Sequence, residues 1–234
     1  MKLVAQIRKL SAWIFFIPFL SINFCLLISV NYMMLENTIF SVDMIGRSNF
    51  TIPYLDGSLS ISRASRTFPQ YLIFKPAMII TAILLIFYWK KNNQLIGSLN
   101  RVSDKNYKFK IFGVLSAVFL IIHSILLGIE IDIKIFKFLR RVVLLSFIIF
   151  EIIAQGLLVL SFYKLKYKIK HLIDSKILKL KILLVSLLAT IAILSIPILI
   201  TSGNVHLKHG LEWNYFIGVI LFYFLTNLLW KKTT

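Results

Sequence analysis

Six long apolar runs, separated by short segments rich in lysine and arginine, dominate this sequence. They cover about residues 11–33, 70–89, 111–130, 141–163, 180–202 and 213–230. Each run has about 18–23 residues, and about 20 apolar residues at a rise of 1.5 Å each cross the hydrocarbon core of a bilayer. Because 59% of the 234 residues are hydrophobic, no segment remains for a separate soluble domain. The sequence therefore predicts an all-α, polytopic membrane protein whose single domain is a bundle of six transmembrane helices.

The distribution of Lys and Arg predicts the orientation of these helices. Eighteen of the 27 basic residues lie at the N-terminus, in the second and fourth connections and in the C-terminal tail, whereas eight lie in the other connections. Cytoplasmic segments carry the excess of Lys and Arg in membrane proteins. We therefore expect both termini in the cytoplasm and the long first loop, residues 34–69, on the non-cytoplasmic face. The membrane is expected to be a bacterial inner membrane or another plasma membrane.

The N-terminal segment has the basic start of a signal peptide. Its apolar run continues to about Met33 with no small-residue cleavage site behind it. We therefore expect the run to be retained as the first span.

The formal net charge of +18 does not indicate nucleic-acid binding. The basic residues lie in short clusters at the ends of apolar runs, where they meet lipid headgroups. Cys25 is the single cysteine, so an intrachain disulfide and CxxC metal spacings are both excluded. His206, His209 and Glu212 lie near one another in sequence, but their loop contains Gly203 and Gly210 and no HExxH motif is present. We expect no metal and no cofactor.

Four polar residues lie within or at the edge of the apolar runs, namely His123, Glu130, Glu151 and Gln155. Such groups cost several kcal/mol in hydrocarbon and usually face protein or a water-filled cavity. Glu151 lies near the middle of the fourth run, with Gln155 on the same helix face at i+4. Ser116, His123 and Glu130 repeat at spacing seven and share one stripe of the third helix. These residues predict either a proton- or cation-handling site or hydrogen bonds between helices, and both interpretations stay open.

The segment SISRASR, residues 60–66, is the strongest candidate for a binding site. Two arginines at spacing three, with hydroxyl neighbours, suit a phosphate or carboxylate because each guanidinium offers paired donors. Lys75 and Arg140 lie toward the same face of the membrane. We predict that an anionic lipid headgroup binds these six residues: Ser60, Ser62, Arg63, Arg66, Lys75 and Arg140. The alternative is that the arginines snorkel to the surface or pair with acids such as Asp56.

The topology of the chain resembles the Frag1/DRAM/Sfk1 superfamily of six-span membrane proteins. The similarity in topology covers the whole chain: cytosolic termini, one long first non-cytoplasmic loop and short later connections. Similarity in motifs covers about 25 residues, in IPYLDGSLSISRASRTFP with its Ser60-Ile61-Ser62 and Pro69, and in the pair Glu212-Trp213. The resemblance implies a role in lipid handling and supplies no catalytic residues.

The sequence favours a lipid-binding membrane protein over an enzyme, because it shows no convincing Ser-His-Asp spacing, Gly-rich phosphate loop or paired carboxylates. The expected partners are membrane lipids with anionic headgroups, and a second copy of the chain or another membrane protein stays open. Three other functions also stay open. They are a proton-coupled transporter that uses Glu151, Gln155 and His123, a lipid-modifying enzyme with His123 or the His206/His209 pair as base, and a non-catalytic assembly subunit.

Overall fold

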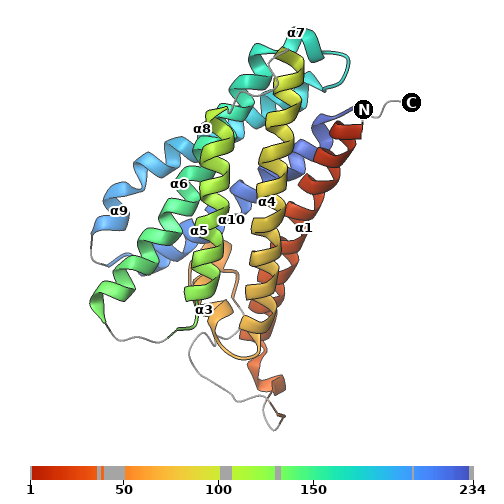
Figure 1. Cartoon of the computed structure of the whole chain (residues 1–234). Coiled ribbons are helices and arrows are strands. Elements are labelled where there is room, and N and C mark those ends of the chain that lie inside the picture. The colour runs from red at the N-terminus through yellow and green to blue at the C-terminus, as the bar shows by residue number, and fades with distance from the viewer. Residues whose placement is uncertain are drawn as a thin grey trace.

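The computed structural model describes residues 2–35, 38–39, 51–100, 107–129, 133–201 and 203–231. Within these ranges, six helices are long and apolar enough to cross a membrane: α1 (Lys2–Val30), α4 (Gln70–Asn100), α5 (Lys108–Leu126), α6 (Lys134–Lys164), α8 (Ser175–Leu194) and α10 (Val205–Leu229). They form one up-and-down bundle, in which the start of α1 and the end of α10 lie at the same end (Figure 1). The predicted all-α, six-span architecture is confirmed, and the protein is an integral membrane protein.

Short helices lie in the connections between the spans. They are η1 (Tyr32–Leu35), α2 (Pro53–Asp56), α3 (Ile61–Arg66), α7 (Lys166–Ile169) and α9 (Ile196–Ile200). An isolated antiparallel β-bridge joins Ile173 to Trp230, beside the start of α8 and the end of α10. The end of the bundle at which α1 begins and α10 ends is the terminus end, and the opposite end is the α3 end.

Several helices extend beyond the apolar runs of the sequence. α1 begins nine residues before residue 11, and α4 continues eleven residues past residue 89, because Lys, Gln and Leu sustain a helix outside hydrocarbon as well as inside it. α8 begins at Ser175, where the Asp174 carboxylate accepts a 2.7 Å hydrogen bond from the backbone N–H of Lys176. Lys181 lies inside α8, and its side chain is fully buried.

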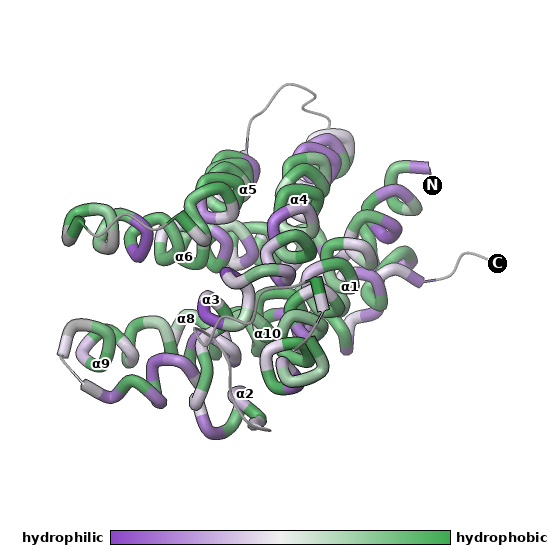
Figure 2. The backbone as a smooth tube through the Cα atoms, turned by 90° about the horizontal axis from the view of Figure 1, so that it is seen from below, coloured by the Kyte–Doolittle hydropathy of each residue, from purple (hydrophilic) through white to green (hydrophobic). Residues whose placement is uncertain are grey.

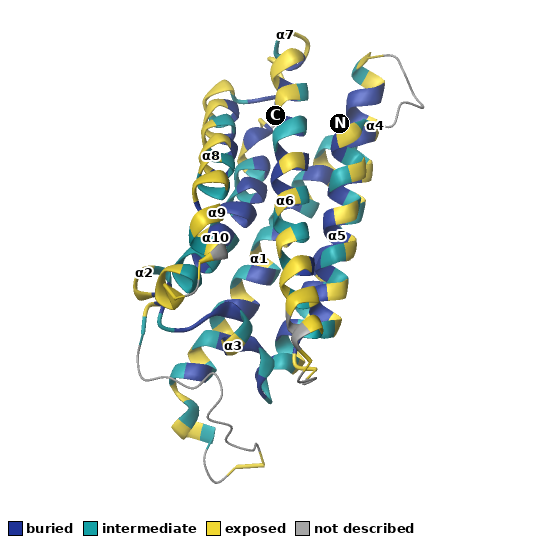
Figure 3. Ribbon diagram, turned by 90° about the vertical axis from the view of Figure 1, so that its left-hand side faces the viewer, coloured by how far each residue is buried: buried dark blue, intermediate teal, exposed yellow. Residues whose placement is uncertain are grey.

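The inner and outer faces of the spans differ in side-chain type. Large apolar residues such as Leu183 and Leu187 are exposed on the outer face of α8, where they would meet lipid (Figure 3). Glycines on inner faces let helices approach closely. A Cβ on Gly113 of α5 would come within 2.3 Å of the indole of Trp89 on α4, and one on Gly218 of α10 would come within 2.5 Å of Leu188 on α8.

Residues 51–69, the described part of the connection that leads into α4, lie at the α3 end of the bundle, with α3 near the centre of the view (Figure 2). The indole Nε1 of Trp213 in α10 donates to the carbonyl of Leu59 at 2.7 Å, and Ser29 of α1 donates to the carbonyl of Ala64 at 3.2 Å. Gly57 has φ +60°, and a Cβ there would lie 1.7 Å from the carbonyl oxygen of His206. This segment therefore packs directly on the α10 backbone.

Candidate functional site

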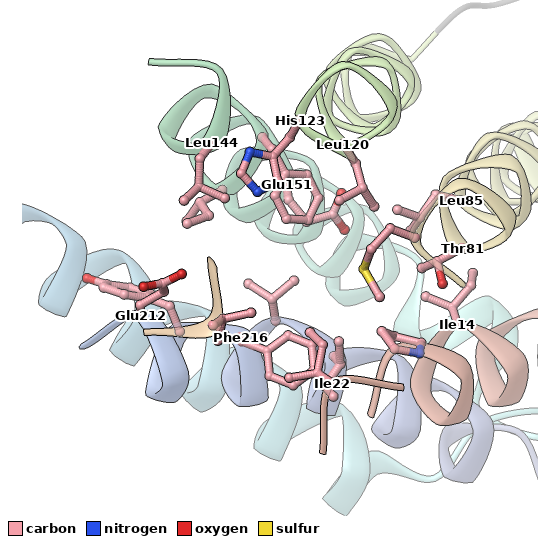
Figure 4. A pocket seen from close by; sticks show the side chains of 18 of the residues that line it. Ile14, Ile22, Thr81, Leu85, Leu120, His123, Leu144, Glu151, Glu212 and Phe216 are labelled. Atoms are coloured by element: carbon pink, nitrogen blue, oxygen red, sulfur yellow. The ribbon is translucent and has the colours of Figure 1, made fainter. Parts of the chain in front are cut away.

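A cavity lies between α1, α4, α5, α6 and α10, in the half of the bundle nearer the α3 end (Figure 4). The volume of the cavity is about 80 Å³. Ile61 of α3 contributes to its wall, and fourteen of the twenty residues around it are apolar. The six others are Thr81, His123, Glu151, Glu212, Tyr215 and Tyr223. A mostly apolar cavity with a few polar groups is the usual form of a ligand site.

Glu151 of α6 lies at the inner end of this cavity, and its side chain is fully buried. Its carboxylate accepts hydrogen bonds from the hydroxyl groups of Ser116 in α5 and Tyr223 in α10. The amide of Gln155 donates to the same carboxylate at 3.2 Å and to the carbonyl of Val219 in α10, also at 3.2 Å. A single carboxylate thus joins three helices, and its donors offset part of the cost of burying it.

His123 lines the cavity from α5, on the same helix face as Ser116 seven residues earlier. Among the residues that the structure describes, its buried Nδ1 has no hydrogen-bond partner. Arg140 of α6 lies close enough for its charge to act on the imidazole. Figure 4 shows the His123 ring across the cavity from Glu212. The imidazole is therefore available to a polar group that enters the cavity.

Glu212 of α10 has a different role, because its carboxylate accepts hydrogen bonds from the backbone N–H groups of Ser62 and Ile61. These are the first amides of α3, which have no partner inside their own helix. The hydroxyl of Ser60 accepts from the next amide, that of Arg63, at 3.1 Å. Glu212 and Ser60 therefore cap α3 and hold it over the cavity.

Buried polar side chains continue from Glu151 toward the terminus end. The phenol ring of Tyr223, whose hydroxyl is bonded to Glu151, packs edge-on against the ring of Tyr88 in α4 with centroids 4.9 Å apart. The hydroxyl of Tyr88 lies 3.3 Å from that of Thr226 in α10, and the ammonium of Lys181 in α8 donates to the Thr226 hydroxyl at 2.5 Å. This buried polar network connects the inner end of the cavity to the last turns of α10.

The residues predicted to bind a headgroup lie near the α3 end and differ in burial and in their interaction partners. Ser60 is buried as the cap of α3, and Ser62 donates its N–H to Glu212. Arg63 is exposed, and its charge acts on His209 in α10. Arg66 ends α3 and is half-buried.

The two other predicted cations come from long helices. The ammonium of Lys75 in α4 lies 5.6 Å from the ring centroid of Tyr71 on the same helix. Arg140 lies near His123, as described above. The structure therefore places Arg63 on the α10 side of the cavity and Arg140 on its α5 and α6 side. Glu130, the remaining sequence candidate, lies outside the described residues.

Sequence reasoning found Glu151, Gln155 and His123 but missed the polar network of Tyr88, Tyr223, Thr226 and Lys181. One signal could have identified Lys181. The buried residues of α8 are Leu178, Lys181, Val185 and Leu188, and this spacing of three, four and three is that of one helix face. A lysine within that pattern is directed into the bundle.

Comparisons of the chain with protein-family models, with curated proteins and with solved structures found no match. The fold and the site define a class, a polytopic integral membrane protein with a mostly apolar internal cavity and a buried polar network. The resemblance to the Frag1/DRAM/Sfk1 superfamily stays a prediction from the sequence.

Proposed function

We propose that the protein binds a membrane lipid, with hydrocarbon in the cavity and an anionic headgroup at the α3 end. The observation that carries this proposal is the cavity, because its wall is mostly apolar and it lies within a bundle that is itself surrounded by lipid. Apolar cavities hold hydrocarbon in preference to water, since water finds too few hydrogen-bond partners there. A lipid chain is the apolar ligand that a membrane supplies.

The cations near the α3 end support an anionic headgroup. The charge of Arg63 acts on His209, and that of Arg140 acts on His123, which lines the cavity. A guanidinium forms paired hydrogen bonds with a phosphate, and each such charged bond contributes about 1.5–3 kcal/mol. The distribution of Lys and Arg along the chain predicts that this end lies on the non-cytoplasmic face, where positive charge is otherwise scarce. The family resemblance also favours a role in lipid handling.

Lipid co-purification tests the headgroup part of this proposal. We expect the double variant Arg63→Ala/Arg140→Ala to lose bound anionic lipid about tenfold or more, as native mass spectrometry measures it. The matched control is Lys164→Ala/Lys168→Ala, which removes two exposed cations from the terminus end. If both double variants retain as much of the same lipid as the wild type, the headgroup assignment is wrong.

A pair of neighbouring residues in α6 tests the position of the hydrocarbon chain. Ile148 lines the cavity, whereas Ile149 is exposed on the outside of the bundle. We expect Ile148→Trp to fill the cavity and to reduce the bound lipid, and Ile149→Trp to leave it unchanged. A folded Ile148→Trp variant that retains the full amount of lipid would show that the chain lies elsewhere.

A further inference from the structure

We propose that the protein also conducts protons through the bundle, along a pathway from the cavity to the terminus end formed by Glu151, Tyr223, Tyr88, Thr226 and Lys181. This activity is distinct from lipid binding and does not depend on it. The cavity occupies the half of the bundle nearer the α3 end, and the buried polar network occupies the other half. The cavity and the polar network together extend along most of the length of the bundle.

Lys181 is the strongest evidence for this pathway. Its side chain is fully buried, and its ammonium donates to Thr226 and lies 3.7 Å from the ring centroid of Phe222. A buried lysine is costly in a membrane helix, and ionisable residues in such positions usually mark ion or proton pathways. An apolar side chain would fill the same space without the free-energy cost of burying an ammonium group. Leu178 and Val185 do so on the same face of α8.

Thr226 links Lys181 to the tyrosines. Its hydroxyl donates to the carbonyl of Phe222 at 2.9 Å, and rotation about its C–O bond directs the same hydrogen to the hydroxyl oxygen of Tyr88, 3.3 Å away. Thr226 also lies three residues before Leu229, which is about 4.5 Å along the helix axis. The carbonyl of Leu229 accepts from the N–H of Asp174 at 2.8 Å, at the terminus end. The network therefore comes within about one helical turn of that end.

The step between Tyr88 and Tyr223 connects the two halves of the pathway. Their rings are in edge-on contact, with centroids 4.9 Å apart. We propose that a proton crosses between these two hydroxyl groups by way of a water molecule that enters transiently. The hydroxyl of Tyr223 is already bonded to the carboxylate of Glu151, which lines the cavity.

Protons balance at every step of this pathway. Each hydroxyl group accepts one proton and releases its own to the next group. When a proton passes from Lys181 to Glu151, the ammonium becomes an amine and the carboxylate becomes a carboxylic acid, so that no group is oxidised or reduced. A proton taken up at Lys181 from one side and released from Glu151 into the cavity restores both groups.

The titratable groups around Glu151 come from three other helices. His123 of α5 and Glu212 of α10 line the cavity with it, Tyr223 of α10 is bonded to it, and Tyr88 of α4 lies beyond Tyr223. The cavity-lining residues of α1 are Ile14, Pro18 and Ile22, which carry no titratable group. His123 and Glu212 are titratable groups that line the cavity together with Glu151.

Proton flux into liposomes tests the proposal. The purified full-length protein is reconstituted into liposomes that contain a pH-sensitive dye, and a membrane potential is imposed with potassium and valinomycin. We expect the wild type to acidify the interior faster than protein-free liposomes do. Tyr88→Phe, Thr226→Val and Lys181→Met each remove one polar group and retain much of the side-chain shape, and we expect each to reduce the flux to about a tenth or less.

Matched controls change exposed residues of the same types. Lys179→Met, in α8, and Tyr163→Phe, in α6, should conduct protons as the wild type does. Tyr88, Thr226 and Lys181 do not line the cavity, so folded variants at these positions should retain co-purified lipid, which separates a loss of conduction from a loss of lipid binding. The proposal is overturned if wild-type flux equals that of protein-free liposomes, or if any two of the three pathway variants fold and conduct normally.

Discussion

The hydroxyl group of Tyr223 donates a hydrogen bond to the carboxylate of Glu151, which joins α10 to α6 at the inner end of the cavity. These residues are 72 positions apart in the chain. Ser116 contributes a second hydroxyl donor from α5. The carboxylate is therefore a common acceptor for three helices, and its removal should affect the stability of the whole bundle.

Replacement of Glu151 by leucine should destabilise the protein by about 1–3 kcal/mol, because the buried hydroxyl of Tyr223 would lose its acceptor, whereas that of Ser116 retains the carbonyl of Gly113. Glu151→Gln retains one acceptor oxygen and should cost clearly less. Equilibrium unfolding in mixed detergent micelles measures both values. If the leucine variant is as stable as the wild type, the hydroxyl group of Tyr223 has found another partner.

Gly57→Ala should be strongly destabilising, and Gly203→Ala only mildly so. Both glycines have positive φ, at which an L-residue costs about 1–2 kcal/mol, but a Cβ at Gly57 would overlap the carbonyl oxygen of His206, whereas none of the described atoms lies within 4 Å of a Cβ at Gly203. Thermal unfolding of the two variants, side by side, measures the difference. Equal effects would mean that the α2 segment does not pack on α10 as described.

Glu212→Ala should loosen α3, since the amides of Ile61 and Ser62 would lose their acceptor. The expected cost is that of a lost helix cap, about 0.5–2 kcal/mol. Hydrogen exchange at these two amides should become faster in Glu212→Ala, and less so in Glu212→Gln, which keeps one oxygen. Unchanged protection in the alanine variant would contradict the capping role.

The stability contributed by Asp56 should depend on pH. Hydrogen bonds from the N–H of Ser58, the hydroxyl of Thr51 and the N–H of Ile52 lower the pKa of this carboxyl from its ordinary value of 3.8 to about 2. Because the folded pKa lies below the unfolded one, the contribution is complete well above pH 3.8 and is lost as the pH falls toward 2.

Comparison of Asp56→Asn with the wild type tests this dependence. The difference in Tm between the two proteins should be constant from pH 7 to about pH 5 and should shrink as the pH is lowered further. A difference that does not change down to pH 3, or that grows on acidification, would show that the carboxylate is not held by these bonds.

Much of the fold could be read from local properties of the chain. A run of about 20 apolar residues must form a helix in a membrane, because its backbone groups find no water there and must bond to one another. The six runs therefore predict six spans without knowledge of their contacts, and the seven-residue spacing correctly places Ser116 and His123 on one inner face of α5. Glu151 and Gln155 could also be identified from the sequence, because polar residues within apolar runs are rare.

The contacts that build the candidate site were decided by the tertiary structure. Tyr88, Lys181 and Thr226 belong to three helices, and each is unremarkable in its own segment: an aromatic near a helix end, a lysine in a basic cluster and a threonine in an apolar run. Their proximity follows from which helices are neighbours and how far each is rotated, and these depend on close packing at glycines such as Gly113 and Gly218. Hydropathy along the chain determines that a segment enters the membrane, because that free energy is a sum over its own residues. The partners of a buried polar group depend instead on residues 35 to 138 positions away, so only the packed bundle specifies them.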